Sequence, residues 1–92
     1  MLTTIIEAKS GWIVAAHCVD LDADTVSCVV VRVTYGGSLA RVLVLDSETA
    51  ASNYVLEHLL ECEFGALGGD LVTQLLKLTR LAIMRAWERY KH

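Results

Sequence analysis

The residues best suited to chemistry lie in the stretch HCVDLDADTVSC, residues 17–28. Three aspartates alternate there, Asp20, Asp22 and Asp24, and occupy the first, third and fifth places of a calcium-binding EF-hand loop. Such a loop also needs a glycine at its sixth place and a bidentate glutamate at its twelfth. This sequence has threonine and valine there instead. An EF-hand is therefore excluded, although weak cation binding to an acidic turn stays open.

A zinc site is also disfavoured in this stretch. His17 and Cys18 are adjacent in an expected strand, so their side chains point to opposite faces of a sheet. Cys28 could approach Cys18 across a hairpin, but two thiols fall short of the ligand set of a structural zinc. We interpret the cysteines as small buried apolar residues. The aspartates then form an acidic hairpin loop and a candidate recognition surface.

Other patterns in the chain give little support to catalysis or to a cofactor. No nucleophile elbow, P-loop, dinucleotide fingerprint or zinc-protease motif is present. The glycine-rich stretch 65–70 (GALGGD) follows an expected helix, lacks a lysine and ends in an aspartate that repels anions. His58 has glutamates beside it but no evident nucleophile. We expect a protein that is not an enzyme and has no metal or cofactor.

The elements that must position these residues begin with strands. The glycine pair Gly36 and Gly37, between two apolar runs, predicts a two-residue hairpin turn. The residues Lys9–Gly11 predict another turn. Four strand-like segments result, and they are Leu2–Ala8, Trp12–Val19, Val26–Tyr35 and Ser38–Leu45.

Helical periodicity replaces the strand pattern after residue 46. Asp46 and Ser47 can cap a helix over about 47–64, and Asp70 can cap a second over about 70–90. Strands followed by helices predict an α+β fold, a four-stranded antiparallel sheet with two helices packed on one face, in the order ββββαα. Residues 1–92 then form a single domain with its sheet in 2–45.

The glycine turn also predicts how the last two strands pair. In this register Arg32 lies beside Arg41 on the sheet face away from the helices. Apolar residues share that face, and they include Leu39, Leu43 and Leu45. Opposed like charges destabilise a sheet, so an acidic or aromatic partner is expected to cover the pair. Alternatively the two arginines splay apart, or Glu7 or another strand acid neutralises them.

The register likewise predicts a face under the helices made of small apolar residues. Those residues are Val29, Val31, Val33, Ala40, Val42 and Val44. The candidate partner contacts are therefore the four on the other face, Arg32, Arg41, Leu39 and Leu43, together with the acidic loop described above.

Composition supports a folded, interacting protein. Hydrophobic residues make up 54% and charged residues 21%, with no proline and a mean hydropathy of +0.47. This argues against disorder and indicates more apolar surface than a small core can bury. No apolar run is long enough to span a membrane, and no signal peptide is evident. Three widely spaced cysteines are typical of reduced thiols, so we expect a cytoplasmic protein.

Charge is unevenly distributed along the chain. Residues 1–70 carry ten acids and three bases, whereas residues 71–92 carry five bases and one acid. Cations near a helix C-terminus match its dipole. Because residues 1–70 are acidic overall and the strands do not interleave basic with aromatic residues, we do not expect direct nucleic-acid binding.

The segment YGGSLARVLVLDSET and the linker GALGGD, set in the ββββαα outline, resemble a group of small phage-encoded anti-CRISPR inhibitors. The resemblance implies a compact cytosolic protein without catalysis. Such a protein binds a bacterial surveillance complex and blocks its nucleic-acid target site. The helices here are longer and more apolar than expected for that group, which favours a dimer.

Three functional hypotheses follow. The first is a non-enzymatic protein-interaction module. One form of it is a phage or mobile-element inhibitor that occludes a basic, nucleic-acid-binding complex such as a CRISPR effector. The second is a homo-oligomeric structural or regulatory domain that self-associates through its open sheet face. The third is a small enzyme or ligand-binding subunit with a pocket between sheet and helices.

Overall fold

The computed structural model describes the backbone of residues 5–22 and 25–91, and side chains within 10–20 and 28–90. It shows an α+β protein with an antiparallel sheet and helices, the predicted class. The elements in chain order are β1 (Ile5–Lys9), β2 (Trp12–Asp22), β3 (Thr25–Tyr35), β4 (Ser38–Leu45), α1 (Ser47–Ala51), α2 (Asn53–Phe64), the 3-10 turn η1 (Gly65–Leu67) and α3 (Gly69–Lys91).

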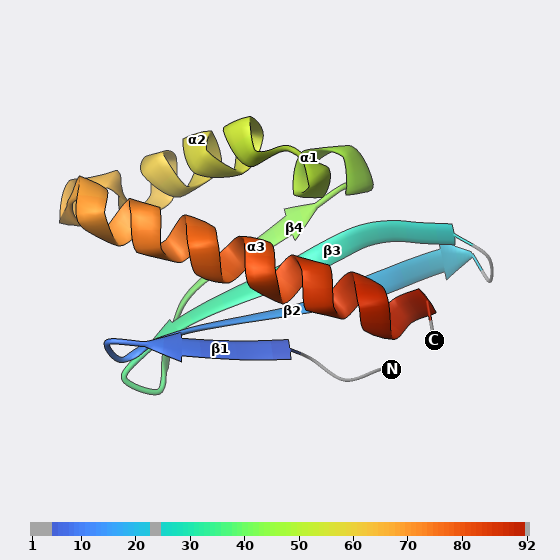
Figure 1. The fold of residues 1–92 in the computed structure, drawn as a ribbon, viewed down its shortest axis with the longest axis horizontal. Helices are drawn as coiled ribbons and strands as arrows, with labels where there is room; N and C mark the ends of the chain where they lie inside the picture. The colour runs from blue at the N-terminus through green and yellow to red at the C-terminus, as the bar shows by residue number, and fades with distance from the viewer. Residues whose placement is uncertain (1–4, 23–24, 92) are drawn as a thin grey trace.

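The sheet is an antiparallel meander with strand order β1-β2-β3-β4 (Figure 1). Gly36 and Gly37 turn the chain between β3 and β4 with φ values of 57° and 86°. Positive φ at both central residues is the geometry of the tight turn that suits the twist of a hairpin. The predicted glycine hairpin is therefore confirmed.

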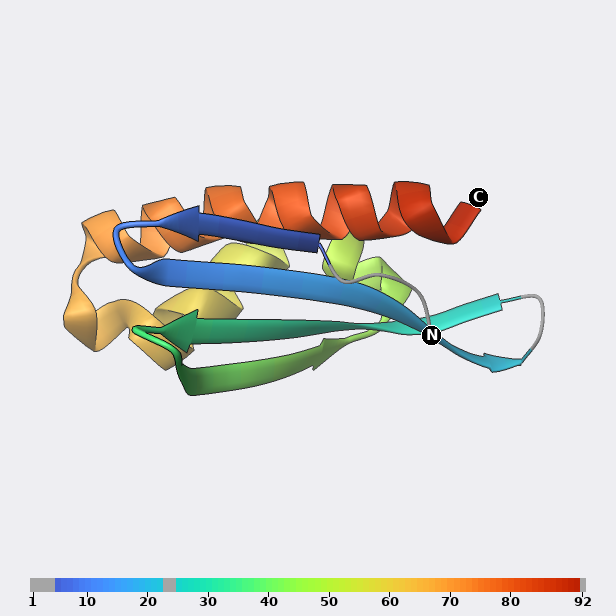
Figure 2. The same cartoon turned by 90° about the horizontal axis from the view of Figure 1, so that it is seen from below.

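The helices form a second layer on one face of the sheet. α3 packs on β1 and β2, α1 packs on β3 and β4, and α2 packs against α3. Figure 2 shows the strands in front of this helical layer, with no described element on the side that faces the viewer. The core lies between the layers, and its fully buried members include Val14, Val31, Val33, Leu56, Leu60 and Leu75.

The helical region departs from the two helices that we predicted. The expected helix 47–64 is broken at Ser52, whose backbone is extended (φ −99°, ψ 112°). The Ser52 hydroxyl accepts a hydrogen bond from the Val55 amide at 3.3 Å and so caps α2. Asp46 caps α1 as predicted, because its Oδ1 accepts the Thr49 amide at 2.7 Å. Because Ser52 caps the new helix, the interruption costs little free energy.

The second departure is the hairpin between β2 and β3. We predicted that β2 ends at Val19 and that an acidic loop follows, but the strand continues to Asp22. Asp20 pairs with Val26 and Asp22 with Thr25, with register shifts after Val19 and after Asp20. The two strands extend as a narrow ribbon beyond the helical layer (Figures 1 and 2). Most of the expected loop is therefore part of a strand.

Candidate functional site

The pairing of β3 with β4 contains a β-bulge that the glycine turn did not predict. Thr34 lies opposite Leu39 as expected, but Val33 lies opposite Arg41, which leaves Ala40 as an extra residue. A bulge places two residues of one strand against one of its partner. Because side chains alternate along a strand, every residue of β4 from Arg41 onward lies on the face opposite to the predicted one.

The bulge corrects the predicted arginine pair. Arg32 lies opposite Val42 and not opposite Arg41. Leu43 lies opposite Val31 and is buried in the core, so it is not an open-face residue. Two of the four candidates, Arg32 and Leu39, stay on the open face.

Packing explains the shifted register. On the helix side, β3 contributes the small side chains of Val29 and Val31, which lie opposite Leu45 and Leu43. These leucines fill the space under the helices better than the valines of β4 would. Val42 and Val44 are turned outward in exchange and are exposed. The face under the helices was thus predicted correctly for β3 and for Ala40, which packs against the core, and wrongly for Val42 and Val44.

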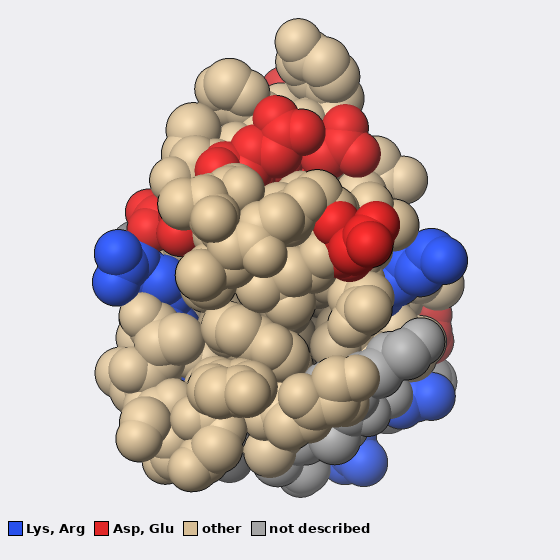
Figure 3. All heavy atoms as spheres, turned by 90° about the vertical axis from the view of Figure 1, so that its left-hand side faces the viewer, with Lys and Arg blue, Asp and Glu red and all other residues tan. Residues whose placement is uncertain are grey.

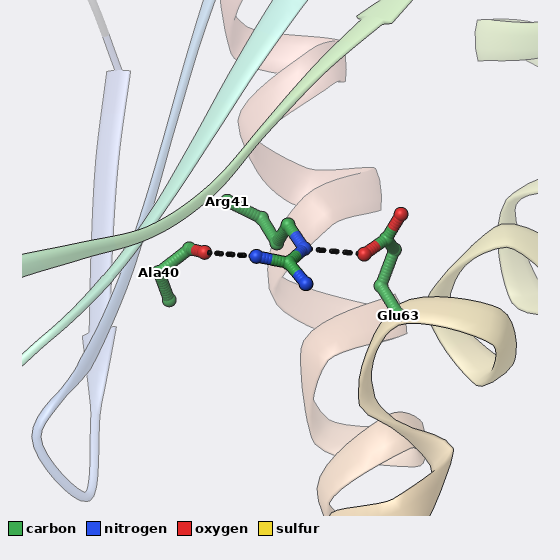
Figure 4. A network of polar contacts seen from close by, with 3 residues as sticks. All are labelled: Ala40, Arg41 and Glu63. Carbon is green, nitrogen blue, oxygen red and sulfur yellow. Dashed lines mark hydrogen bonds and ion pairs between the residues drawn. The ribbon is translucent and has the colours of Figure 1, made fainter.

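Arg41 contacts α2 from the helix side of the sheet. Its Nε donates a hydrogen bond to Glu63 Oε2, and its Nη1 donates to the carbonyl oxygen of Ala40 at 3.1 Å (Figure 4). The two side chains are 55% and 34% exposed, so the ion pair is a surface one worth about 0.2–1 kcal/mol. Arg41 therefore pairs with a glutamate of α2 and does not lie opposite Arg32.

The described part of the outward side of the sheet is mostly apolar. We call it the uncovered face and define it by the described side chains that alternate with the buried ones, which are Ile13, Ala15, His17, Val19, Cys28, Val30, Arg32, Thr34, Leu39, Val42 and Val44. Along β4 the exposed fractions are 66% for Val44, 53% for Leu39 and 41% for Val42. An antiparallel sheet with one solvated face normally carries polar residues there.

Three polar side chains, Arg32, His17 and Thr34, lie within this mostly apolar surface. Arg32 is its one cation and has Ala15 on one side and Val42 on the other. His17 lies opposite Val30, and its Nδ1 is buried without a hydrogen-bond partner in the described structure. A large apolar face around one arginine is the kind of surface that marks a protein–protein contact.

The remaining candidates are only partly described. Asp20 is exposed on the β2–β3 ribbon, and Asp22 is in β2 although its side chain is not described. Asp24 lies outside the described residues. A recognition surface formed by the three aspartates therefore remains a prediction.

The cysteine and histidine pattern does not form a metal centre in the described structure. Cys18 packs against the core, whereas Cys28 lies opposite Val19 on the uncovered face, so the two free thiols are on opposite sides of the sheet. Burial raises the pKa of Cys18, and Asp20 and Cys28 raise it further. Within the described residues, no three His, Cys, Asp or Glu side chains are placed to hold a metal ion.

One contact on α2 was missed from the sequence. Cys62 Sγ lies 4.0 Å from His58 Nε2 on the exposed side of the helix. The i, i+4 spacing of these residues could have identified it. Neither residue lines the groove at Ala50 and Arg80 or the hollow at Glu57 and Glu61. Figure 3 shows acidic side chains gathered at the end of the molecule where α2 ends and α3 begins. It is a surface contact without the surroundings of a catalytic pair.

None of the helices in the described part of the chain has the length and apolar character needed to cross a membrane. Comparisons with protein family models, curated proteins and solved structures find no match to this chain.

Proposed function

We propose that this chain is a non-enzymatic protein-interaction module that binds another protein through the uncovered face. The observation that carries the proposal is the row of exposed apolar side chains on β4, Leu39, Val42 and Val44, beside Arg32. Such a row on a sheet face without a covering helix is costly in water and is stabilised when a partner excludes the water.

The size of this effect follows from the exposed fractions. Complete burial of a valine or leucine side chain contributes about 1.5–3 kcal/mol. Because Leu39, Val42 and Val44 are 53%, 41% and 66% exposed, covering them contributes roughly 2–5 kcal/mol before the cost of association. Micromolar binding requires about 8 kcal/mol, so the β2 and β3 part of the face must contribute as well.

The arginine specifies the chemistry of the partner. A buried guanidinium without a partner costs several kcal/mol, so a covering surface must supply a group that Arg32 can bind. A carboxylate provides charge-assisted hydrogen bonds, and an aromatic ring provides a cation–π contact. The partner that fits is an apolar surface with an acidic or aromatic group opposite Arg32.

One form of this function is a phage or mobile-element inhibitor of a bacterial complex that binds nucleic acid. Support for it comes from the outline resemblance and from the exposed Asp20 on the projecting ribbon, which suits a basic partner. We place the module in the cytosol, where Cys18, Cys28 and Cys62 would stay reduced as the free thiols that they are in this structure.

Self-association through the same face is the second candidate. The bulge favours self-association, because Arg41 lies on the helix side of the sheet and each copy brings only Arg32 to the contact. The mass in solution, measured by light scattering over a concentration range, separates the two candidates. A monomer supports binding to a different protein, and a dimer that dissociates in the Val42→Asp/Val44→Asp variant supports self-association.

Capture from a bacterial lysate tests binding to a different protein. Wild type and the Tyr54→Asp/Val55→Asp control, which changes an exposed surface of α2, should retain the same partner. The Val42→Asp/Val44→Asp variant should lose it while keeping its circular dichroism spectrum. Equal retention by the folded face variant would show that the uncovered face is not the contact.

A further inference from the structure

A groove between α1 and the second half of α3 is separate from the uncovered face. Its volume is about 390 Å³, which is within the range of small-molecule sites. Val29 of β3 contributes to its lining from the sheet. The other lining residues are Ser47, Ala50, Ala51, Arg80, Leu81, Ile83, Met84, Arg85, Trp87 and Glu88.

The shape of the groove depends on small residues on α1. Ala50 and Ala51 leave space that longer side chains would fill. Across from them, Met84 and Trp87 are 56% and 36% exposed, although both are large apolar residues. Apolar side chains therefore line the groove, and they remain accessible to a ligand.

Charge is arranged along the groove in a defined order. Arg80 Nη1 donates a hydrogen bond to the carbonyl oxygen of Ala50, which fixes the guanidinium between the two helices. Glu88 is two helical turns further along α3, about 12 Å away along the axis. Arg85 adds a second cation to the lining. An anionic group of a ligand is therefore favoured near Arg80. The carboxylate of Glu88 lies too far along α3 to repel that group strongly.

We propose that this groove binds a small organic acid, with its carboxylate at Arg80 and its alkyl or aryl body along Met84 and Trp87. One N–H of Arg80 is used by Ala50, and a guanidinium has five. A preorganised guanidinium next to an apolar wall matches the amphipathic form of such an acid. The site is independent of the uncovered face, so either proposal can fail without the other.

Fluorescence of Trp87 measures the binding directly. Trp12 is the other tryptophan of the chain, and Trp12→Phe leaves Trp87 as the one reporter. Octanoate should change its emission in a saturable way, and octanol and octylamine should bind at least about tenfold more weakly because they lack the anionic group. Equal binding of octanol and octanoate, or no binding of octanoate, would overturn the proposal.

Two variants locate the site. Ala51→Leu fills the groove and should weaken octanoate binding by about tenfold or more. Ala66→Leu makes the same change at an exposed alanine of η1 and should leave it unaltered. Arg80→Gln should remove the preference for octanoate over octanol. Unchanged binding in Ala51→Leu, or loss of binding in Val42→Asp/Val44→Asp, would place octanoate elsewhere and contradict the proposal.

Discussion

Leu43→Ala tests where the β-bulge places the side chains of β4. Leu43 is only 9% exposed and belongs to the core, so its truncation leaves a cavity. Substitutions of this kind cost about 2–5 kcal/mol, and we expect a value at the lower end because Leu43 lies on an edge strand. Leu39→Ala makes the same chemical change at a side chain that is 53% exposed, and it should cost less than about 1 kcal/mol.

Urea denaturation followed by circular dichroism measures both variants. A small domain has an m-value of about 1–3 kcal/mol/M, so Leu43→Ala should lower the midpoint by roughly 1–2 M. The midpoint of Leu39→Ala should stay close to that of wild type. The register without a bulge would expose Leu43 and bury Val42. Equal losses for the two leucine variants, or a larger loss for Val42→Ala than for Leu43→Ala, would refute the bulge.

Three further predictions concern the caps and the ion pair. Hydrogen bonds from Thr49 lower the pKa of Asp46 below its ordinary 3.8. Its carboxylate therefore stabilises the fold above about pH 4, and this effect is lost as pH falls through the lowered pKa. Below about pH 4, the urea midpoint of wild type should fall more steeply than that of Asp46→Asn. Ser52→Ala removes the cap of α2 and should cost about 1 kcal/mol in urea denaturation; no loss would contradict the capping role. A double-mutant cycle with Arg41→Ala and Glu63→Ala should give a coupling below about 1 kcal/mol that weakens with salt, and a larger, salt-independent coupling would contradict a surface pair.

Local signals in the sequence predicted the parts of the fold that depend on neighbouring residues. Gly36 and Gly37 were identified because a tight hairpin requires positive φ at both positions. Asp46 was identified because its side chain can bind the amides of the first turn. Ser52 carries the same type of signal, but it was overlooked inside an apolar pattern that suited one long helix.

The bulge at Ala40 has no comparable local signal. It depends on which side chains of β4 fill the space under the helices, and on a glutamate that lies 22 residues away from Arg41. The groove also has no local signal in the sequence, because its two walls are joined by a hydrogen bond between Arg80 and Ala50, which are 30 residues apart. The sequence therefore predicted an apolar open face with Arg32 and Leu39, but tertiary packing decided which residues of β4 complete it.

Photo-crosslinking from the sheet surface tests the proposed function most directly. A benzoyl-phenylalanine introduced in place of Val44 probes the uncovered face, and one in place of Tyr54 probes an exposed site on α2. After irradiation in a bacterial lysate, we predict a discrete adduct of higher mass from position 44 and none from position 54. The adduct mass distinguishes a second copy of the chain from a different protein. Failure of position 44 to form any adduct beyond that of position 54 would contradict the role of the uncovered face in protein binding.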